Sequence, residues 1–403
     1  MIRLKSILAL VCISMTIGIL ILADANAVRA ADKSVKVGIL VSYTGIAPAQ
    51  AKMVSDGAEL AFAEAGGKAA GMPIEVIKED TEFNPTVALT KIRRLVEDHK
   101  VNFVVGPISS AVAMAIQDYV SKQNVILIIP CAFSRQLTTM KNARENIFRT
   151  VETTDQGNYP MGAWIFKNTP HRKVVVGGQD YAAGHDSVNA FKAGFEAAGG
   201  KVVKEVFSPI GTMDLASFLT TMNAAGADAV YVFYGGTDAV RFVQQYQEFG
   251  LKSKMPLFGY TSVADDPYLP SMGKAALGVI SSTAYTASLD IPANTPFVQA
   301  YSAKYGDLPA HYSEYGYVAG KIIVTVADAL KGDLSNASVT AKMIKQVADQ
   351  INTPSGPLEF DKYNQRIVNE YVQKVEEKDG KLTNVVIDKI GKVAQEDVWK
   401  WAN

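Results

Sequence analysis

The residues of this chain best suited to chemistry are hydroxyl-bearing and aromatic side chains that directly follow short apolar runs. In open α/β sheets, ligands bind outside the carboxyl ends of the strands, so the residues after each predicted strand are the first place to look for a site. Hydroxyls and aromatic rings dominate these positions, whereas charged catalytic groups do not. The candidates are Tyr43, Ser109, Ser110, Phe133, Arg135, Tyr181, Tyr234, Thr237, Tyr260 and Thr261.

Two serines carry the most specific chemistry among these candidates. Ser109 and Ser110 open a predicted helix directly after a tight turn. Free backbone N–H groups and the positive end of the helix dipole favour an anion such as a carboxylate there, and a serine hydroxyl adds a donor. An ordinary N-cap explains a serine at this place equally well.

The aromatic candidates could form the walls of an apolar slot with polar tips. These are Phe133 and the tyrosines at 43, 181, 234 and 260. For any single ring, packing in the core is the simpler interpretation. Arg135 could clamp a second anion bidentately, although a solvated loop arginine is the more common case.

Several classes of site have no support in the sequence. The four histidines stand apart from acidic or cysteine partners at ligand spacing, so neither a metal nor a nucleophile–base pair is indicated. The phosphate-loop, dinucleotide and nucleophile-elbow motifs are absent, and no cofactor is implied. His185 beside Asp186 is the one faint hint of catalysis. The absence of these motifs does not exclude an enzyme, but it makes one the less expected class.

The elements that must position the candidates alternate regularly. Short β-rich runs alternate with amphipathic segments about every 25 to 30 residues, which is typical of βαβ units and a parallel sheet. This pattern runs twice, so the fold class predicted is α/β with two doubly wound, Rossmann-like lobes. The strands expected are 35–42, 74–79, 101–105 and 125–129 in the first set, and 173–177, 202–207, 229–234 and 256–260 in the second.

The last third of the chain departs from this alternation. After a strand at 279–284 and three helices, residues 370–375 and 382–389 are predicted to form an antiparallel hairpin through Lys378-Asp-Gly380. The stretch 353–357 is the strongest internal punctuation, and we expect it to be a crossing between lobes.

The first residues predict export. A basic start, an apolar run at 7–22 and small residues at 23–31 are typical of a secretory signal peptide cleaved near Ala27 to Ala31. A retained anchor is the alternative. Cleavage after Ala31 removes three of the 40 basic and one of the 40 acidic residues, which leaves a net charge of −2. That balance argues against nucleic acid or an anionic membrane as the main partner, and the single remaining cysteine, Cys131, excludes an intramolecular disulfide.

The chain resembles the type I extracytoplasmic solute-binding proteins of ABC importers, the family that includes leucine/isoleucine/valine-binding protein. Each matching piece is weak alone, but their order and spacing are specific. They are 37–40 with Thr44-Gly45, 56–61, 104–110, 148–150, 224–231, 276–278 and 353–361. The resemblance implies a non-enzymatic, two-lobed fold with a hinge of crossing segments that closes on ligand. Its division would be 1–31 signal peptide, 32–152 plus 281–355 first lobe, and 153–280 plus 356–403 second lobe.

The resemblance also implies roles for individual residues. Ser110 resembles the family serine that takes the ligand carboxylate, and Ala132 resembles a backbone contact. Tyr181 is similar to the aromatic side chain that the second lobe contributes, and Gln50 stands where amino-acid binders carry an aromatic residue.

Two departures from the family pattern disfavour an α-amino acid as ligand. Phe133 replaces a threonine, and Thr261 replaces the glutamate that holds the ammonium group. A buried ammonium without its countercharge is strongly unfavourable. We therefore predict a small organic carboxylate, plausibly aromatic, as the ligand. A branched-chain amino acid remains the alternative if Glu314 or Asp238 supplies the missing acid, and a secreted enzyme or a sensory subunit on the same scaffold is a further one.

The resemblance implies a periplasmic protein that docks on inner-membrane permease subunits. We expect it to act as a monomer.

Overall fold

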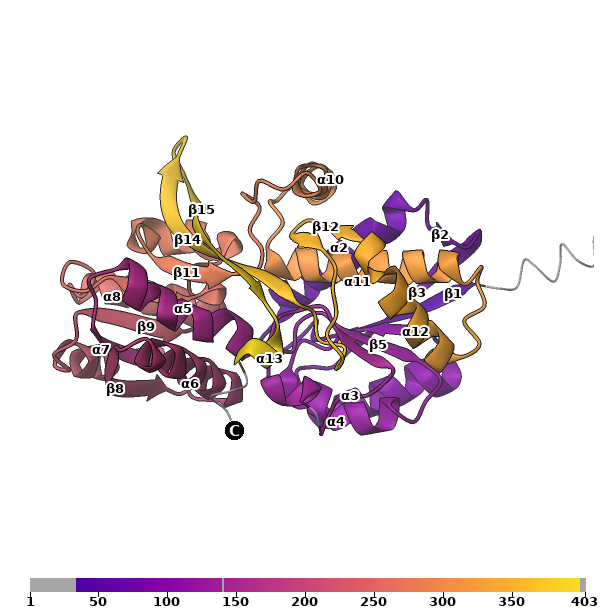
Figure 1. Ribbon diagram of the computed structural model, residues 1–403, viewed down its shortest axis with the longest axis horizontal. Coiled ribbons are helices and arrows are strands. Elements are labelled where there is room, and N and C mark those ends of the chain that lie inside the picture. The colour runs from indigo at the N-terminus through magenta and orange to yellow at the C-terminus, as the bar shows by residue number, and fades with distance from the viewer. Residues whose placement is uncertain (1–33, 140, 399–403) are drawn as a thin grey trace, which may run out of the picture.

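The computed structural model of the protein describes residues 34–139 and 141–398, which form two lobes side by side (Figure 1). The first lobe holds a six-stranded sheet of order β2-β3-β1-β4-β5-β6, parallel except for the β2–β3 pair. Its strands are β1 (Val35–Val41), β2 (Lys68–Ala69), β3 (Met72–Asp80), β4 (Phe103–Val105), β5 (Ile126–Ile129) and β6 (Ile147–Arg149).

Both faces of this sheet are covered by helices, and the alternation of side chains along β1 shows how. Val35, Val37 and Ile39 pack into the core under one set of helices, whereas Leu40 packs into the core under the other. The first set comprises α2 (Pro48–Glu64), α11 (His311–Ala329) and α12 (Ala337–Val347). The second comprises α3 (Pro85–Arg93), which continues in a π-helical turn to Asp98, and α4 (Ser110–Val120).

The second lobe is built on a seven-stranded sheet of order β15-β14-β11-β10-β9-β7-β8. Strands β7 to β11 are parallel, and β14 pairs antiparallel with both β11 and β15. The strands are β7 (Lys173–Gln179), β8 (Lys201–Ser208), β9 (Ala229–Phe233), β10 (Leu257–Tyr260), β11 (Ile280–Thr283), β14 (Val368–Lys378) and β15 (Lys381–Val393).

Helices flank this second sheet in the same way. Phe191 of α6 and Met161 of α5 pack on one face, whereas Phe242 of α8 and Leu219 of α7 pack on the other. The helices are α5 (Thr154–Asn168), α6 (Ala182–Ala197), α7 (Ala216–Asn223), α8 (Gly236–Glu248) and the short α9 (Leu269–Met272) and α13 (Gln395–Val398). Helix α10 (Asn294–Tyr305) packs beside α2 and α11 through Phe297 and Tyr301.

The predicted fold class and the C-terminal hairpin are confirmed, with one correction at a boundary. The predicted end of the second lobe at residue 280 falls inside β11, because Ile280–Thr283 pairs with β10 on one side and β14 on the other. The stretch expected to cross between lobes forms a small two-stranded turn, β12 (Asn352–Thr353) with β13 (Gly356–Pro357). The predicted signal peptide lies outside the described residues.

A buried arginine holds the loop that follows β5. Arg149 is fully buried at the end of β6, and its guanidinium donates to the Ala132 carbonyl at 3.1 Å and the Ser134 carbonyl at 2.5 Å. Burial lowers the pKa of Arg149 to about 9, which still leaves it charged at neutral pH. Arg149 thereby fixes the loop after β5.

Within the part of the chain that the structure describes, no helix is long and apolar enough to cross a membrane.

Candidate ligand-binding site between the two lobes

The loops at the carboxyl ends of the strands meet where the two lobes touch. Polar contacts that join the lobes there include Gln50 Nε2 to Tyr268 Oη at 3.4 Å, Ser134 Oγ to Asp186 Oδ2 at 3.3 Å, and His311 Nδ1 to Asp265 Oδ1 at 3.2 Å. Parallel strands place the loops at their carboxyl ends on one edge of each sheet, so this junction is the place where a ligand can contact both lobes.

The two candidate serines have different roles in the structure. Ser109 is the N-cap of α4, and its Oγ accepts the N–H of Val112 at 3.4 Å. The Oγ of Ser110 accepts the backbone N–H of Ser134 at 3.1 Å, so its own proton can be donated to another acceptor. The turn before them requires glycine, because a Cβ on Gly106 would lie 1.9 Å from the Leu40 carbonyl oxygen. The capping explanation therefore applies to Ser109 and leaves Ser110 available for a ligand.

The loop after β5 presents Ala132 to Arg135 beside Ser110. Because the carbonyl of Ala132 already accepts from Arg149, a backbone contact from Ala132 to a ligand would use its N–H. Arg135 faces a fully buried acid, with Nη1 3.7 Å from Asp155 Oδ2. Burial raises the pKa of Asp155 to about 7, although Arg135 opposes this rise. The positive charge of Arg135 is thus directed at Asp155.

Six aromatic side chains from both lobes gather next to this loop, and we call them the interlobe aromatic cluster. The ring of Phe133 lies 5.8 Å from Tyr260 and 6.5 Å from both Tyr312 and Tyr315, with edge-on geometry. Phe233 stacks on Tyr260 at 5.9 Å, and Tyr181 lies 6.3 Å from Phe233. The six are Phe133, Tyr312 and Tyr315 from the first lobe, and Tyr181, Phe233 and Tyr260 from the second.

Two of the predicted wall residues lie outside this cluster. Tyr234 belongs to the core of the second lobe, where its ring stacks on Phe242 at 4.4 Å and its hydroxyl bonds Ser208 at 2.7 Å. Side chains alternate along a strand, so its neighbour Phe233 points to the other side. The hydroxyl of Tyr43 bonds Ser55 at 2.6 Å, and burial raises its pKa to about 12.

The remaining predicted residues are scattered around the junction. Gln50 is buried and reaches the second lobe at Tyr268, whereas the Thr237 side chain is exposed in the first turn of α8. Thr261 is buried, and its hydroxyl accepts from Gln373 Nε2 at 3.4 Å. An amide, and not a carboxylate, is therefore the polar neighbour of Thr261.

Glu314 and Asp238, the two acids that could have replaced the missing glutamate, are each paired with an arginine. Glu314 receives two hydrogen bonds of 3.1 Å from Arg366, and Asp238 pairs with Arg241 and accepts from Gln179 at 2.8 Å. Both carboxylates already have cationic partners within their own surroundings.

A buried acid that the sequence did not reveal lies under the aromatic cluster. Glu152 is fully buried and accepts hydrogen bonds from Tyr260 and, at 2.8 and 2.7 Å, from Tyr315. Burial raises the pKa of Glu152, and the bond from Tyr315 lowers it. Beside it, burial and the charge of Glu152 raise the pKa of Glu370 well above its ordinary range. Glu370 is therefore the partner that keeps its proton.

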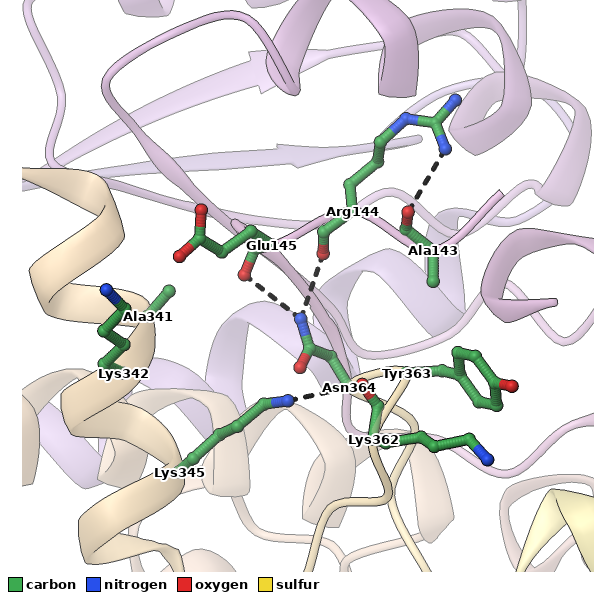
Figure 2. A pocket seen from close by; sticks show the side chains of 9 residues that line it. All are labelled: Ala143, Arg144, Glu145, Ala341, Lys342, Lys345, Lys362, Tyr363 and Asn364. Carbon is green, nitrogen blue, oxygen red and sulfur yellow. Dashed lines mark hydrogen bonds between the residues drawn. The ribbon is translucent and has the colours of Figure 1, made fainter. Parts of the chain in front are cut away.

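Two pockets lie away from this junction. The pocket of about 300 Å³ in Figure 2 lies between α12 and the loop before β6, and it is rimmed by lysines and an arginine. Its lining residues are Ala143, Arg144, Glu145, Ala341, Lys342, Lys345, Lys362, Tyr363 and Asn364. The other, of about 550 Å³, is lined by residues of α2, β3 and α10. Neither contains a sequence-predicted site residue, and the described residues contain no cluster of three or more potential metal ligands.

Comparison with known proteins decides the family. The family model described as periplasmic binding protein matches residues 34–381. The chain belongs to the periplasmic binding protein family. It is a solute-binding protein of an ABC transporter, a non-enzymatic class, which confirms the resemblance seen in the sequence.

Three relatives of this solute-binding protein are informative. The Leu/Ile/Val-binding protein homolog 6 of Brucella melitensis is 28% identical over 351 residues, covering 86% of this chain and 88% of the relative. An ABC transporter substrate-binding protein from Sphaerobacter thermophilus is 33% identical with a TM-score of 0.85, covering 89% and 98% of the two chains. A Rhodopseudomonas palustris solute-binding protein in complex with 3,4-dihydroxybenzoic acid is 30% identical with a TM-score of 0.82, covering 90% and 98%.

Proposed function

We propose that this solute-binding protein captures a small aromatic carboxylate between its lobes and delivers it to the permease of an ABC importer. The observation that carries the proposal is the interlobe aromatic cluster, to which both lobes contribute three rings. Flat apolar surfaces from two separate bodies suit a ligand with an aromatic ring, because such a ring gains edge-to-face and stacking contacts beyond its buried area.

The polar groups around the cluster support an acid without an amine. Ser110 has a hydroxyl proton to donate, next to the N-terminus of α4, where a carboxylate is favoured. Thr261 lies where the resemblance would place the ammonium-binding glutamate, and its neighbour is the amide of Gln373. The Rhodopseudomonas relative in complex with 3,4-dihydroxybenzoic acid supports the same class of ligand.

A branched-chain amino acid is the second candidate, and Glu152 is the observation that favours it. Glu152 is a buried carboxylate in contact with two rings of the cluster, and the Brucella relative carries a Leu/Ile/Val-binding name. Against it, both Glu152 oxygens already accept a tyrosine hydroxyl from Tyr315. An ammonium group would have to displace that bond.

The proposal includes the place and partner of the protein. The apolar run and small residues of 1–31 are typical of an export signal, so we propose a periplasmic protein that acts as a monomer. Ligand binding would close the lobes about the joining segments, and the closed form would dock on permease subunits in the inner membrane.

The ligand class is tested by thermal unfolding with benzoate, 3,4-dihydroxybenzoate, leucine and valine. A ligand at about 100 Kd stabilises the folded state by roughly 2.7 kcal/mol, so a true ligand raises the melting temperature by several degrees. We expect a rise with the aromatic acids only. A rise with leucine or valine, and none with the aromatic acids, would contradict the proposal.

Ser110→Ala tests the anion end of the site. We expect the affinity for benzoate to fall about tenfold or more, because a hydrogen bond to a charged group is lost, while the melting temperature without ligand stays nearly unchanged. Ser121→Ala, at the other end of the same helix, is the matched control and should leave affinity unchanged. If Ser110→Ala lowers stability and leaves affinity intact, Ser110 is a structural residue only.

A further inference from the structure

His311 is a buried polar residue at the lobe junction that the proposed anion site does not use. It begins α11 and is 1% exposed. Its Nδ1 lies 3.2 Å from Oδ1 of Asp265, which follows β10 in the second lobe. Its ring lies 3.9 Å from Tyr312 and 5.6 Å from Tyr315, two members of the aromatic cluster. The imidazole is thus fixed from one side by an acid and lies against the cluster.

The second ring nitrogen of His311, Nε2, is buried and makes no hydrogen bond with any residue that the structure describes. A buried polar atom without a partner is unfavourable, so such an atom in a binding protein is a candidate ligand contact. Burial lowers the pKa of His311, but the carboxylates of Asp265, Glu152 and Asp266 outweigh this effect and raise it. The raised pKa favours the imidazolium form of His311, in which both ring nitrogens carry a proton and can donate.

The position of His311 relative to Ser110 defines the shape of a ligand that reaches both. Ser110 bonds the N–H of Ser134, and the preceding residue is Phe133. The ring of Phe133 lies 6.5 Å from Tyr312, and Tyr312 contacts His311. Phe133 therefore links the serine to the histidine in this series of contacts. A flat ligand lying along Phe133 with its carboxylate at Ser110 would direct its opposite edge toward His311.

We propose that His311 is a specificity-determining ligand contact whose Nε2–H donates to an oxygen on the aromatic ring, at the edge opposite the carboxylate. The preferred ligands are then benzoates with a ring hydroxyl, and Asp265 is the positioning residue that orients the imidazole. This inference rests on the proposed function, because it requires an aromatic acid in the site.

The test is calorimetric titration of the purified protein with benzoate and 4-hydroxybenzoate. The wild-type protein should bind 4-hydroxybenzoate about tenfold or more tightly than benzoate, because a site built to hydrogen-bond a hydroxyl discriminates against the analogue that lacks it. In His311→Phe this preference should fall to about onefold, because the loss of affinity should be larger for 4-hydroxybenzoate than for benzoate. His171→Phe is the matched control, because His171 also faces an aspartate, Asp228 at 3.7 Å, but precedes β7 at the opposite end of its strand from the junction.

The outcomes separate the two proposals. If the wild-type protein binds both acids equally, or if His311→Phe keeps the preference, the inference about His311 is overturned and the proposed function stands. If neither acid binds and leucine does, the proposed function fails and the inference fails with it.

A measurement on the wild-type protein guards against misfolding of the variant. In protein labelled with ¹⁵N-histidine, the Nε2 resonance of His311 should shift with 4-hydroxybenzoate and stay in place with benzoate. The same shift with both acids, or with neither, would overturn the assignment.

Discussion

Two glutamates at the lobe junction, Glu314 and Glu152, are both fully buried but have different hydrogen-bond partners. Glu314 is held by the guanidinium of Arg366 with two bonds of 3.1 Å and by Ser355 Oγ at 2.6 Å. Among the residues that the structure describes, no cation forms a hydrogen bond with Glu152, which instead accepts from the hydroxyls of Tyr260 and Tyr315. Both arrangements keep a carboxyl group out of water, but only one of them does so with an opposite charge.

The difference follows what each acid joins. Arg366 also donates to the Thr150 carbonyl at 3.1 Å, so the Glu314 pair ties α11 to two segments that run between the lobes. The Glu152 network includes Tyr260 of the second lobe, which belongs to the aromatic cluster. A neutral hydroxyl can leave a carboxylate at less cost than a buried cation can. The paired acid thus joins the segments that run between the lobes, whereas the hydroxyl-bonded acid contacts the second lobe through Tyr260.

Removing the cation that pairs with Glu314 should destabilise the protein more than any other change considered. Arg366→Met leaves Glu314 buried without a countercharge, which should lower the free energy of unfolding by about 3–5 kcal/mol in urea denaturation. Lys345→Met, which removes an exposed lysine of α12, is the control and should change it by less than about 0.5 kcal/mol.

A second substitution tests whether the unpaired charge of Glu314 causes the loss of stability. Adding Glu314→Leu to Arg366→Met removes the unpaired charge and should recover part of the loss. A loss below about 1 kcal/mol for Arg366→Met alone would mean that the two glutamates do not differ as described.

A smaller effect, visible as a pH dependence, is expected from the acid that shares its site with Glu152. The folded protein keeps a proton on Glu370 that the unfolded chain releases above an ordinary pKa of about 4.3, so stability falls as the pH rises from there toward the raised folded pKa. Glu370→Gln removes this contribution. Between pH 5 and 8 the variant should lose less stability with rising pH than the wild type, by up to about 1.4 kcal/mol per pH unit.

The comparison variant for that measurement is Glu377→Gln, an exposed glutamate on the same strand β14. Asp155 and Asp266, whose pKa values burial raises to about 7 and about 6, contribute a slope of the same sign in every variant. Only the difference between variants is therefore assigned to Glu370. Equal slopes for the wild type and Glu370→Gln would show that Glu370 is ionised in the folded protein.

Much of the fold could be predicted because local patterns determine it. The alternation of apolar runs and amphipathic segments predicted both sets of strands, and Lys378-Asp-Gly380 predicted the hairpin of β14 and β15. Helix starts were less predictable where no capping side chain announces them. Helices α6 and α11 begin at Ala182 and His311, and neither N-cap residue makes a side-chain capping bond within the described part of the chain.

The candidate site was only partly predictable, because its members come from distant parts of the chain. Phe133 and Tyr181 directly follow strands, and the strand-end rule indicated them. Tyr312 and Tyr315 lie on α11, which belongs to the first lobe although it follows β7 to β11 of the second lobe in the chain. Glu152 lies on the segment by which the chain leaves the first lobe after β6. Only the packing of α11 against the junction brings them to Phe133, and no local pattern carries that information.

Binding of an aromatic carboxylate between the lobes can be observed in a crystal structure of the protein grown with benzoate. The ring should lie against Phe133 within the interlobe aromatic cluster, with a carboxylate oxygen accepting from Ser110 Oγ. Benzoate bound in the lysine-rimmed pocket of Figure 2 instead, or a junction that stays free of ligand at saturating benzoate, would rule out the proposed site between the lobes.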